Sequence, residues 1–388
     1  MQPPGLTTRF AAASPPPAPV GRALAGFTAL LVAALTMIVW RPLRSADIQP
    51  PDRAVLAAAV ADAGRWPVAE RSGWLRDCRG PLTRVLLAAE NGIWPNSLPA
   101  MRTVALALHA ASALLLVVLV AQLANHFQPQ SPLVPFGLAT VAALAALLYA
   151  LHPQRAAALA NLLGHGVPLA ATAALGAAVL QVASWSARRP WAARCGAAAL
   201  MLVSLLTGAT AVAVPVALVG LDAFRQRSLK RALRAGAVLL LVTLGGLVLG
   251  LARLHGPPET LERPDDLRDT APGVTLPARF AIGARGLAQQ ALAALWPPLL
   301  PTDTDAVQPV SVLKLAYAGP LLGLLGMCGL IVAAARRLPA VALALTAVLL
   351  IAAPPLLLWR PGRAAASPPD GTLPAAAAAV ALGYPAHR

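Results

Sequence analysis

The chain has 388 residues, of which 58% are hydrophobic and only 12% are charged, and its mean hydropathy is +0.67. A soluble domain carries about 25% charged residues, so this composition favours a membrane protein over a soluble helical one. The net charge of +16 is large enough for a nucleic-acid partner. The basic residues form no stripe interleaved with aromatic residues, and we therefore expect no nucleic acid among the partners.

Apolar runs long enough to cross a bilayer, which takes about 17–25 residues, recur along the chain. The first, 23–40, is too long for the apolar part of a signal peptide and reads as an uncleaved transmembrane helix. The later runs are 104–123, 133–151, 156–184, 196–221, 236–254, 315–335 and 338–358. We predict an all-α polytopic membrane protein with about 8–10 transmembrane helices.

Two basic segments set the expected orientation. One contains Arg188, Arg189 and Arg194, and the other contains Arg225, Arg227, Lys230, Arg231 and Arg234. Basic loops stay on the cytoplasmic side of a membrane. The run 196–221 between them should therefore enter and leave on that side, as a bent hairpin with its tip at 207–210.

This orientation divides the chain into a membrane domain and its flanks. Residues 1–22 are expected to be a disordered cytoplasmic tail, 23–359 the transmembrane domain and 360–388 a Pro/Ala-rich tail. Two long polar segments, 41–103 and 255–310, are expected on the extracytoplasmic side. Within the first of them, 55–63 and 83–92 have the pattern of helices that lie at the membrane surface.

Two breaks interrupt the apolar sequence and mark where a site is expected. One is the His152-Pro153 step, and the other is the 207–210 turn that precedes Pro215. A residue before proline avoids the helical conformation. Non-helical backbone at membrane depth is tolerated only where it is buried in protein or lines a water-filled cavity.

The order of several motifs resembles a known family. The motifs are Pro81-Leu82-Thr83, a helix with His109, Ala-Leu-His-Pro at 150–153, Pro215 to Asp222, and Trp296 to Asp305. Their order and spacing over residues 20–360 are similar to the membrane part of the tetratricopeptide-repeat O-mannosyltransferase-like proteins, which are C-class glycosyltransferases. The repeats themselves, of about 34 residues each, are not encoded here.

The resemblance implies an extracytoplasmic activity at the inner, or plasma, membrane. A sugar, mannose in the family, would pass from a polyprenyl-phosphate donor in the membrane lipid to a protein or lipid acceptor. A carboxylate of the first outer loop would serve as the general base, and cationic side chains would stabilise the phosphate that leaves. The resemblance implies no cofactor.

The resemblance assigns candidate roles by position. Asp47 is the candidate catalytic base, the candidate phosphate ligands are Arg155, His165, Arg79 and Arg84, and the candidate cavity-lining residues are His152 and Thr207. Each has an ordinary alternative. Asp47 could be an exposed loop residue, His165 a surface histidine between two glycines, and Arg155 an anchor at the level of the lipid headgroups. His152 could simply end a helix, and His109 could be a hydrogen-bonded packing residue.

Several charged positions of the family are replaced in this chain. Ala157, Leu163 to Val167, and Thr207-Gly208-Ala209 stand where the family carries acidic or basic side chains. Charged groups at membrane depth are usually kept for function. A second hypothesis is therefore a catalytically degenerate scaffold or a protein that binds the lipid carrier. No metal site is expected, because the cysteines lack ligand spacing and Asp265-Asp266 is flanked by Arg263 and Arg268.

Overall fold

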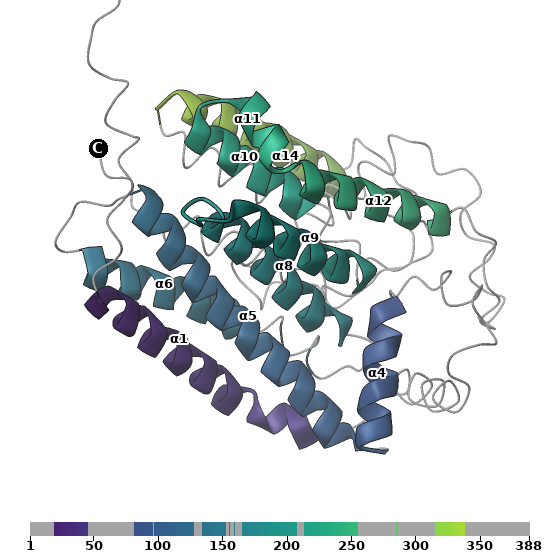
Figure 1. The fold of residues 1–388 in the computed structure, drawn as a ribbon. Helices are drawn as coiled ribbons and strands as arrows, with labels where there is room; N and C mark the ends of the chain where they lie inside the picture. The colour runs from purple at the N-terminus through teal and green to yellow at the C-terminus, as the bar shows by residue number, and fades with distance from the viewer. Residues whose placement is uncertain are drawn as a thin grey trace, which may run out of the picture.

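The computed structural model describes residues 19–45, 81–95, 97–127, 134–152, 155, 159, 165–207, 213–254, 285 and 315–337. These residues form helices and turns, with no strand among them (Figure 1). Three of the described helices are long and apolar enough to cross a membrane, namely Leu98–His126, Gly166–Ala183 and Pro190–Thr207. Shorter apolar helices cover Ala23–Val39, Ala139–Ala150, Ala237–Gly246 and Ala318–Val332. The described part of the chain is thus all-α, and the length and apolar composition of its helices are those of a membrane protein.

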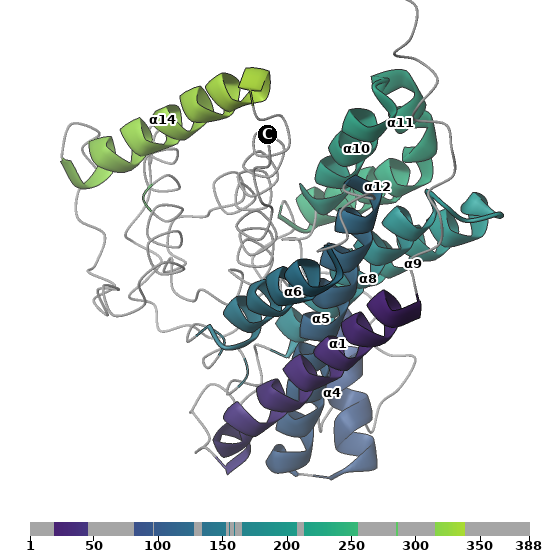
Figure 2. The same ribbon diagram turned by 90° about the vertical axis from the view of Figure 1, so that its left-hand side faces the viewer.

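The first layer of the bundle consists of α1 (Pro19–Val39), α5 (Leu98–Phe127) and α6 (Val134–Ala150). A short 3₁₀ helix, η1 (Arg41–Ser45), follows α1 and packs against α5. Figure 2 shows α1 and α6 lying along α5. Their common core is rich in alanine, including Ala113 and Ala146. Small side chains let helix backbones approach closely where lipid offers no hydrophobic driving force.

The second layer is formed by α8 (Gly166–Ala183) and α9 (Pro190–Thr207), with α8 next to α5. Glycines make the α8–α9 contact close. A Cβ atom on Gly176 would lie 2.9 Å from Leu200 Cδ1, and one on Gly196 would lie 3.0 Å from Leu180 Cδ1. Between α5 and α8, the Thr172 hydroxyl donates to the Leu108 carbonyl at 2.8 Å.

The remaining helices follow in the chain as α10 (Ala213–Gln226), α11 (Leu229–Ala235), α12 (Ala237–Leu254) and α14 (Leu315–Arg337). α10 packs on α11, and α12 packs on α9. The turn between α10 and α11 uses Arg227 with a φ of 48°. The helix α4 (Pro81–Ile93) lies at the end of the bundle opposite α11 and contacts α5, α8 and α9 (Figures 1 and 2).

Helix boundaries differ from the sequence prediction at several N-termini. α1 begins at Pro19, inside the expected 1–22 tail, and α9 begins at Pro190, so that Arg194 lies on the helix. α5 begins at Leu98, inside the expected 41–103 loop. Proline suits the first turn of a helix, since the N–H group it lacks would have no intrahelical partner there. Residues 55–63, 255–284, 286–314 and 338–358 lie outside the described residues, so the predicted helix count stays a prediction.

Candidate functional site

The α4 helix directs polar side chains into the protein. Thr83, Leu87, Glu90 and Asn91 are all buried, whereas Ile93 is exposed. These four follow the i, i+4, i+7, i+8 spacing of one helix face. Of them only Leu87 is apolar, so α4 packs against α8 and α9 through hydroxyl, carboxyl and amide groups.

Glu90 meets His165 in this buried interface. Oε2 of Glu90 lies 3.2 Å from Nδ1 of His165, and their side chains are 4% and 0% exposed. The two atoms are within ion-pair distance, but their orientation does not satisfy a hydrogen bond. Among the described residues, neither carboxylate oxygen of Glu90 nor Nε2 of His165 has a hydrogen-bond partner. Buried polar atoms without partners are rare and point to a ligand or a catalytic role.

The close contact between Gly166 and Thr83 explains why a glycine follows His165. Gly166 is the first residue of α8, and a Cβ atom there would overlap Oγ1 of Thr83 and lie 3.2 Å from Cγ2 of Thr207. The Thr207 hydroxyl donates to the Val203 carbonyl of its own helix at 2.7 Å. The start of α8, the end of α9 and the inner face of α4 therefore meet at the Glu90–His165 pair.

A second buried polar group surrounds the end of α6. The Ala150 carbonyl accepts hydrogen bonds from Trp40 Nε1 at 2.8 Å and from His109 Nε2 at 3.0 Å. Because a carbonyl can only accept, His109 must carry its proton on Nε2. The His152-Pro153 step ends α6 and leaves its last carbonyls to be capped by other helices. His109 is thus a hydrogen-bonded packing residue, as one sequence interpretation had it.

Arg155 belongs to this second group. Its guanidinium carbon lies 5.1 Å from the centre of the Tyr149 ring, and the residue is 1% exposed. Burial lowers the pKa of Arg155 to about 10, partly offset by Tyr149. The side chain therefore stays cationic at neutral pH. Its stacking on an aromatic ring suits the weakly hydrated guanidinium group.

The structure brings two of the predicted residues together. His165 and Thr207 lie around Gly166, and Arg155 lies against Tyr149. His152 is half-buried and makes a contact of its own. Arg84 lies on α4, but its side chain is outside the described residues, as are Asp47 and Arg79 altogether.

Two of the alternative interpretations are wrong. His165 is fully buried and is no surface histidine, and Arg155 is buried inside the protein and is no headgroup anchor. Sequence reasoning also missed Glu90. The available signal was its i+7 spacing from Thr83 on an amphipathic helix. Residues 83–92 were assigned to the membrane surface, where this polar face would have met water.

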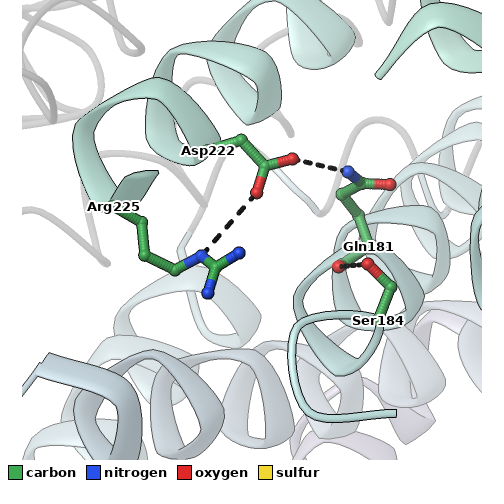
Figure 3. Close-up of polar contacts among 4 residues, drawn as sticks. All are labelled: Gln181, Ser184, Asp222 and Arg225. Carbon is green, nitrogen blue, oxygen red and sulfur yellow. Dashed lines mark hydrogen bonds and ion pairs between the residues drawn. The ribbon is translucent and has the colours of Figure 1, made fainter. Parts of the chain in front are cut away.

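The opposite end of α8 carries a different polar cluster (Figure 3). Gln181 Nε2 donates to Asp222 Oδ2 at 2.7 Å, and Arg225 Nε lies 4.0 Å from Asp222 Oδ1. The Arg225 guanidinium also lies 4.8 Å from the centre of the Trp185 ring. Burial lowers the pKa of Arg225, partly offset by Asp222. This carboxylate is held by protein partners, unlike that of Glu90.

The distance between the Glu90–His165 pair and the Asp222 cluster is close to the thickness of a membrane. His165 precedes α8 directly and Gln181 lies near its other end, and 16 helical positions span about 24 Å at 1.5 Å per residue. The hydrocarbon part of a bilayer is about 30 Å thick. The alanine-rich core lies between the Glu90–His165 pair and the Asp222 cluster. This arrangement is expected if the pair lies near one membrane surface and the cluster near the other.

Comparison of the chain with known protein families, with curated proteins and with solved structures finds no match. Among the described residues, no group of three or more His, Cys, Asp or Glu side chains could hold a metal ion. Function is therefore argued from the site itself.

Proposed function

We propose that this protein is a polytopic membrane glycosyltransferase of the divergent, O-mannosyltransferase-like kind. It transfers a mannose-like sugar from a polyprenyl-phosphate donor to a hydroxyl group of a protein or lipid acceptor. The observation that carries the proposal is the Glu90 carboxylate, which is buried beside His165 without a hydrogen-bond donor among the described residues. Glu90 also lies in 41–103, the expected first outer segment, where a base is required.

The chemistry needs one proton acceptor and one stabilised leaving group. Glu90 takes the proton of the acceptor hydroxyl as that oxygen forms a bond to the anomeric carbon. The bond from this carbon to the phosphate oxygen breaks, and polyprenyl phosphate leaves with the bonding electrons. His165 faces the carboxylate through Nδ1 and orients it. A general base placed in this way contributes about 10²- to 10⁴-fold to the rate.

Cationic side chains complete the proposed site. Arg155 keeps its charge at neutral pH despite burial and is the proposed phosphate ligand, together with Arg79 and Arg84. A planar guanidinium binds phosphate through two parallel hydrogen bonds. Asp47 is the second candidate base in the same outer segment.

The proposed side of activity follows from charge. The exposed basic residues near Asp222 favour a cytoplasmic position for that end of α8. Glu90 and His165, at the other end, then face the extracytoplasmic side of the inner membrane. Lipid-linked donor and acceptor would meet there.

The test is donor turnover by purified full-length protein. Wild type, Glu90→Gln and Asp47→Asn are compared for release of polyprenyl phosphate from a labelled polyprenyl-phosphate mannose. We expect turnover by wild type and a loss of about 100-fold or more in Glu90→Gln. Loss in Asp47→Asn with normal turnover in Glu90→Gln would move the base to Asp47. No turnover by any form would refute the transferase proposal.

A second candidate is a catalytically inactive scaffold that binds the lipid carrier. One observation favours it, because one candidate phosphate ligand and one candidate cavity-lining residue are engaged by the fold itself. Arg155 stacks on Tyr149, and Thr207 donates to its own helix. Binding of polyprenyl phosphate without consumption of any donor would support this alternative.

A further inference from the structure

A corner of basic and apolar residues lies at the Asp222 end of the bundle. The exposed basic side chains are Arg188, Arg189, Arg225, Arg227, Lys230, Arg231 and Arg234. Between residues 184 and 236 the sequence contains a single carboxylate, that of Asp222. It is 1% exposed and is bound by Gln181 and Arg225. Basic residues therefore outnumber carboxylates in this corner, and its surface carries a net positive charge.

The helix α11 adds exposed apolar side chains to this charge. Leu229 and Leu233 are 62% and 43% exposed and lie four residues apart, on one side of the helix. They alternate with the cations Lys230, Arg231 and Arg234. Apolar residues beside basic ones on a short surface helix are typical of a segment that lies in the headgroup layer of a membrane.

The protein holds α11 firmly in this position. The Ser228 hydroxyl accepts a hydrogen bond from the backbone N–H of Arg231 and so caps the helix. Ala232 is fully buried, and Gly236 lies against the Val219 side chain. α11 packs on α10 through this inner side. The leucine and basic side chains of α11 lie on its outer side and are exposed.

We propose that α11 and the adjoining end of α10 bind the headgroups of anionic phospholipids, with phosphatidylglycerol as the representative probe. The leucines enter the boundary between headgroups and acyl chains, and the cations contact lipid phosphates. Charge complementarity selects this occupant, because an anionic headgroup is attracted by the net positive charge of the corner, whereas a zwitterionic headgroup has no net charge to complement it. Trp191, exposed at the start of α9, is of the residue type that favours the same layer.

The experiment measures lipid binding to the full-length protein in detergent by native mass spectrometry, with phosphatidylglycerol and phosphatidylcholine as competing probes. Wild type is compared with Lys230→Gln/Arg231→Gln. The matched control is Arg41→Gln/Arg44→Gln, which removes two exposed charges from η1. We expect wild type and control to retain phosphatidylglycerol over phosphatidylcholine, and the α11 variant to lose about tenfold in this preference.

Four further outcomes decide the proposal. The charge-conserving variant Lys230→Arg/Arg231→Lys should bind as wild type does, which separates charge from folding. Equal loss in the η1 control, or equal binding of the two lipids by wild type, would overturn the proposal. Displacement of the lipid by inorganic phosphate at the same concentration would also overturn it, because the site would then be an anion site without a need for the lipid.

Discussion

At the level of single residues, the two ends of α8 hold buried carboxylates in different states. Asp222 receives a hydrogen bond from Gln181 and lies within ion-pair distance of Arg225. Glu90 lies within ion-pair distance of the His165 imidazole, and neither of its carboxylate oxygens has a hydrogen-bond partner among the described residues. A buried carboxylate with few partners is costly. We infer that Asp222 serves the fold and that Glu90 serves a reaction.

Replacing His165 tests the free-energy cost of burying the Glu90 carboxylate. His165→Ala leaves the Glu90 carboxylate buried without its partner, and we expect the free energy of unfolding to fall by about 1–3 kcal/mol. The same substitution in a Glu90→Gln background should be less costly, because no charge is left unpaired. The measurement is unfolding by denaturing detergent in mixed micelles, for all four members of the cycle. Strictly additive effects would show that the two side chains do not interact.

The Asp222 cluster gives a prediction of its own. Gln181→Leu removes the donor to Asp222 Oδ2, and we expect it to lower the free energy of unfolding by about 1–3 kcal/mol. Asp222→Asn should be milder, since the amide oxygen can still accept from Gln181. Donor turnover by Asp222→Asn should stay close to that of wild type. A Gln181→Leu protein as stable as wild type would show that this hydrogen bond does not form in the membrane.

The sequence allowed part of the site to be predicted. Arg155 and Thr207 lie at breaks in the apolar sequence, which can be recognised locally, and the resemblance assigned roles to these two residues and to His165 by position. Glu90 was missed because its burial depends on α4 packing against the start of α8 and the end of α9. Those contacts join residues more than 70 positions apart. No pattern within α4 tells whether its polar face meets water or protein.

At the level of elements, apolar length located most of the helices in the described part of the chain, but predicted their ends less well. Proline in the first turn extended α1 and α9 toward the N-terminus. α11 was not foreseen, because a seven-residue basic segment carries no long periodic pattern. The Ser228 cap is its sequence signal. Packing on α10 then supplies the stability that so short a helix lacks on its own.

The contact between α4 and α8 can be tested by compensation. Gly166→Ala places a Cβ atom against Oγ1 of Thr83, and we expect it to push α4 away and lower the melting temperature. Thr83→Ala removes the oxygen, so the double variant Gly166→Ala/Thr83→Ala should regain most of the loss.

The matched control for this test is Gly26→Ala. A Cβ atom at Gly26 would meet nothing within 4 Å, and the substitution should be neutral or slightly stabilising, since alanine is a better helix former. Failure of Thr83→Ala to compensate would show that α4 does not pack on α8 in the way the structure has it.

At the level of the whole molecule, two polar layers enclose an alanine-rich core of about membrane thickness. The proposed orientation places Arg234 on the cytoplasmic side and Ile93 on the extracytoplasmic side. Reporter fusions after these two residues should give opposite signals. An extracytoplasmic signal after Arg234 would reverse the orientation and place Glu90 in the cytoplasm, away from the proposed donor.

The most direct test compares the two buried carboxylates in one assay. Glu90→Gln and Asp222→Asn each neutralise one of them, at opposite ends of α8. With purified full-length protein and a polyprenyl-phosphate mannose donor, we predict turnover by wild type and Asp222→Asn, and a loss of about 100-fold or more in Glu90→Gln without a loss of stability. Equal turnover by wild type and Glu90→Gln would contradict the account.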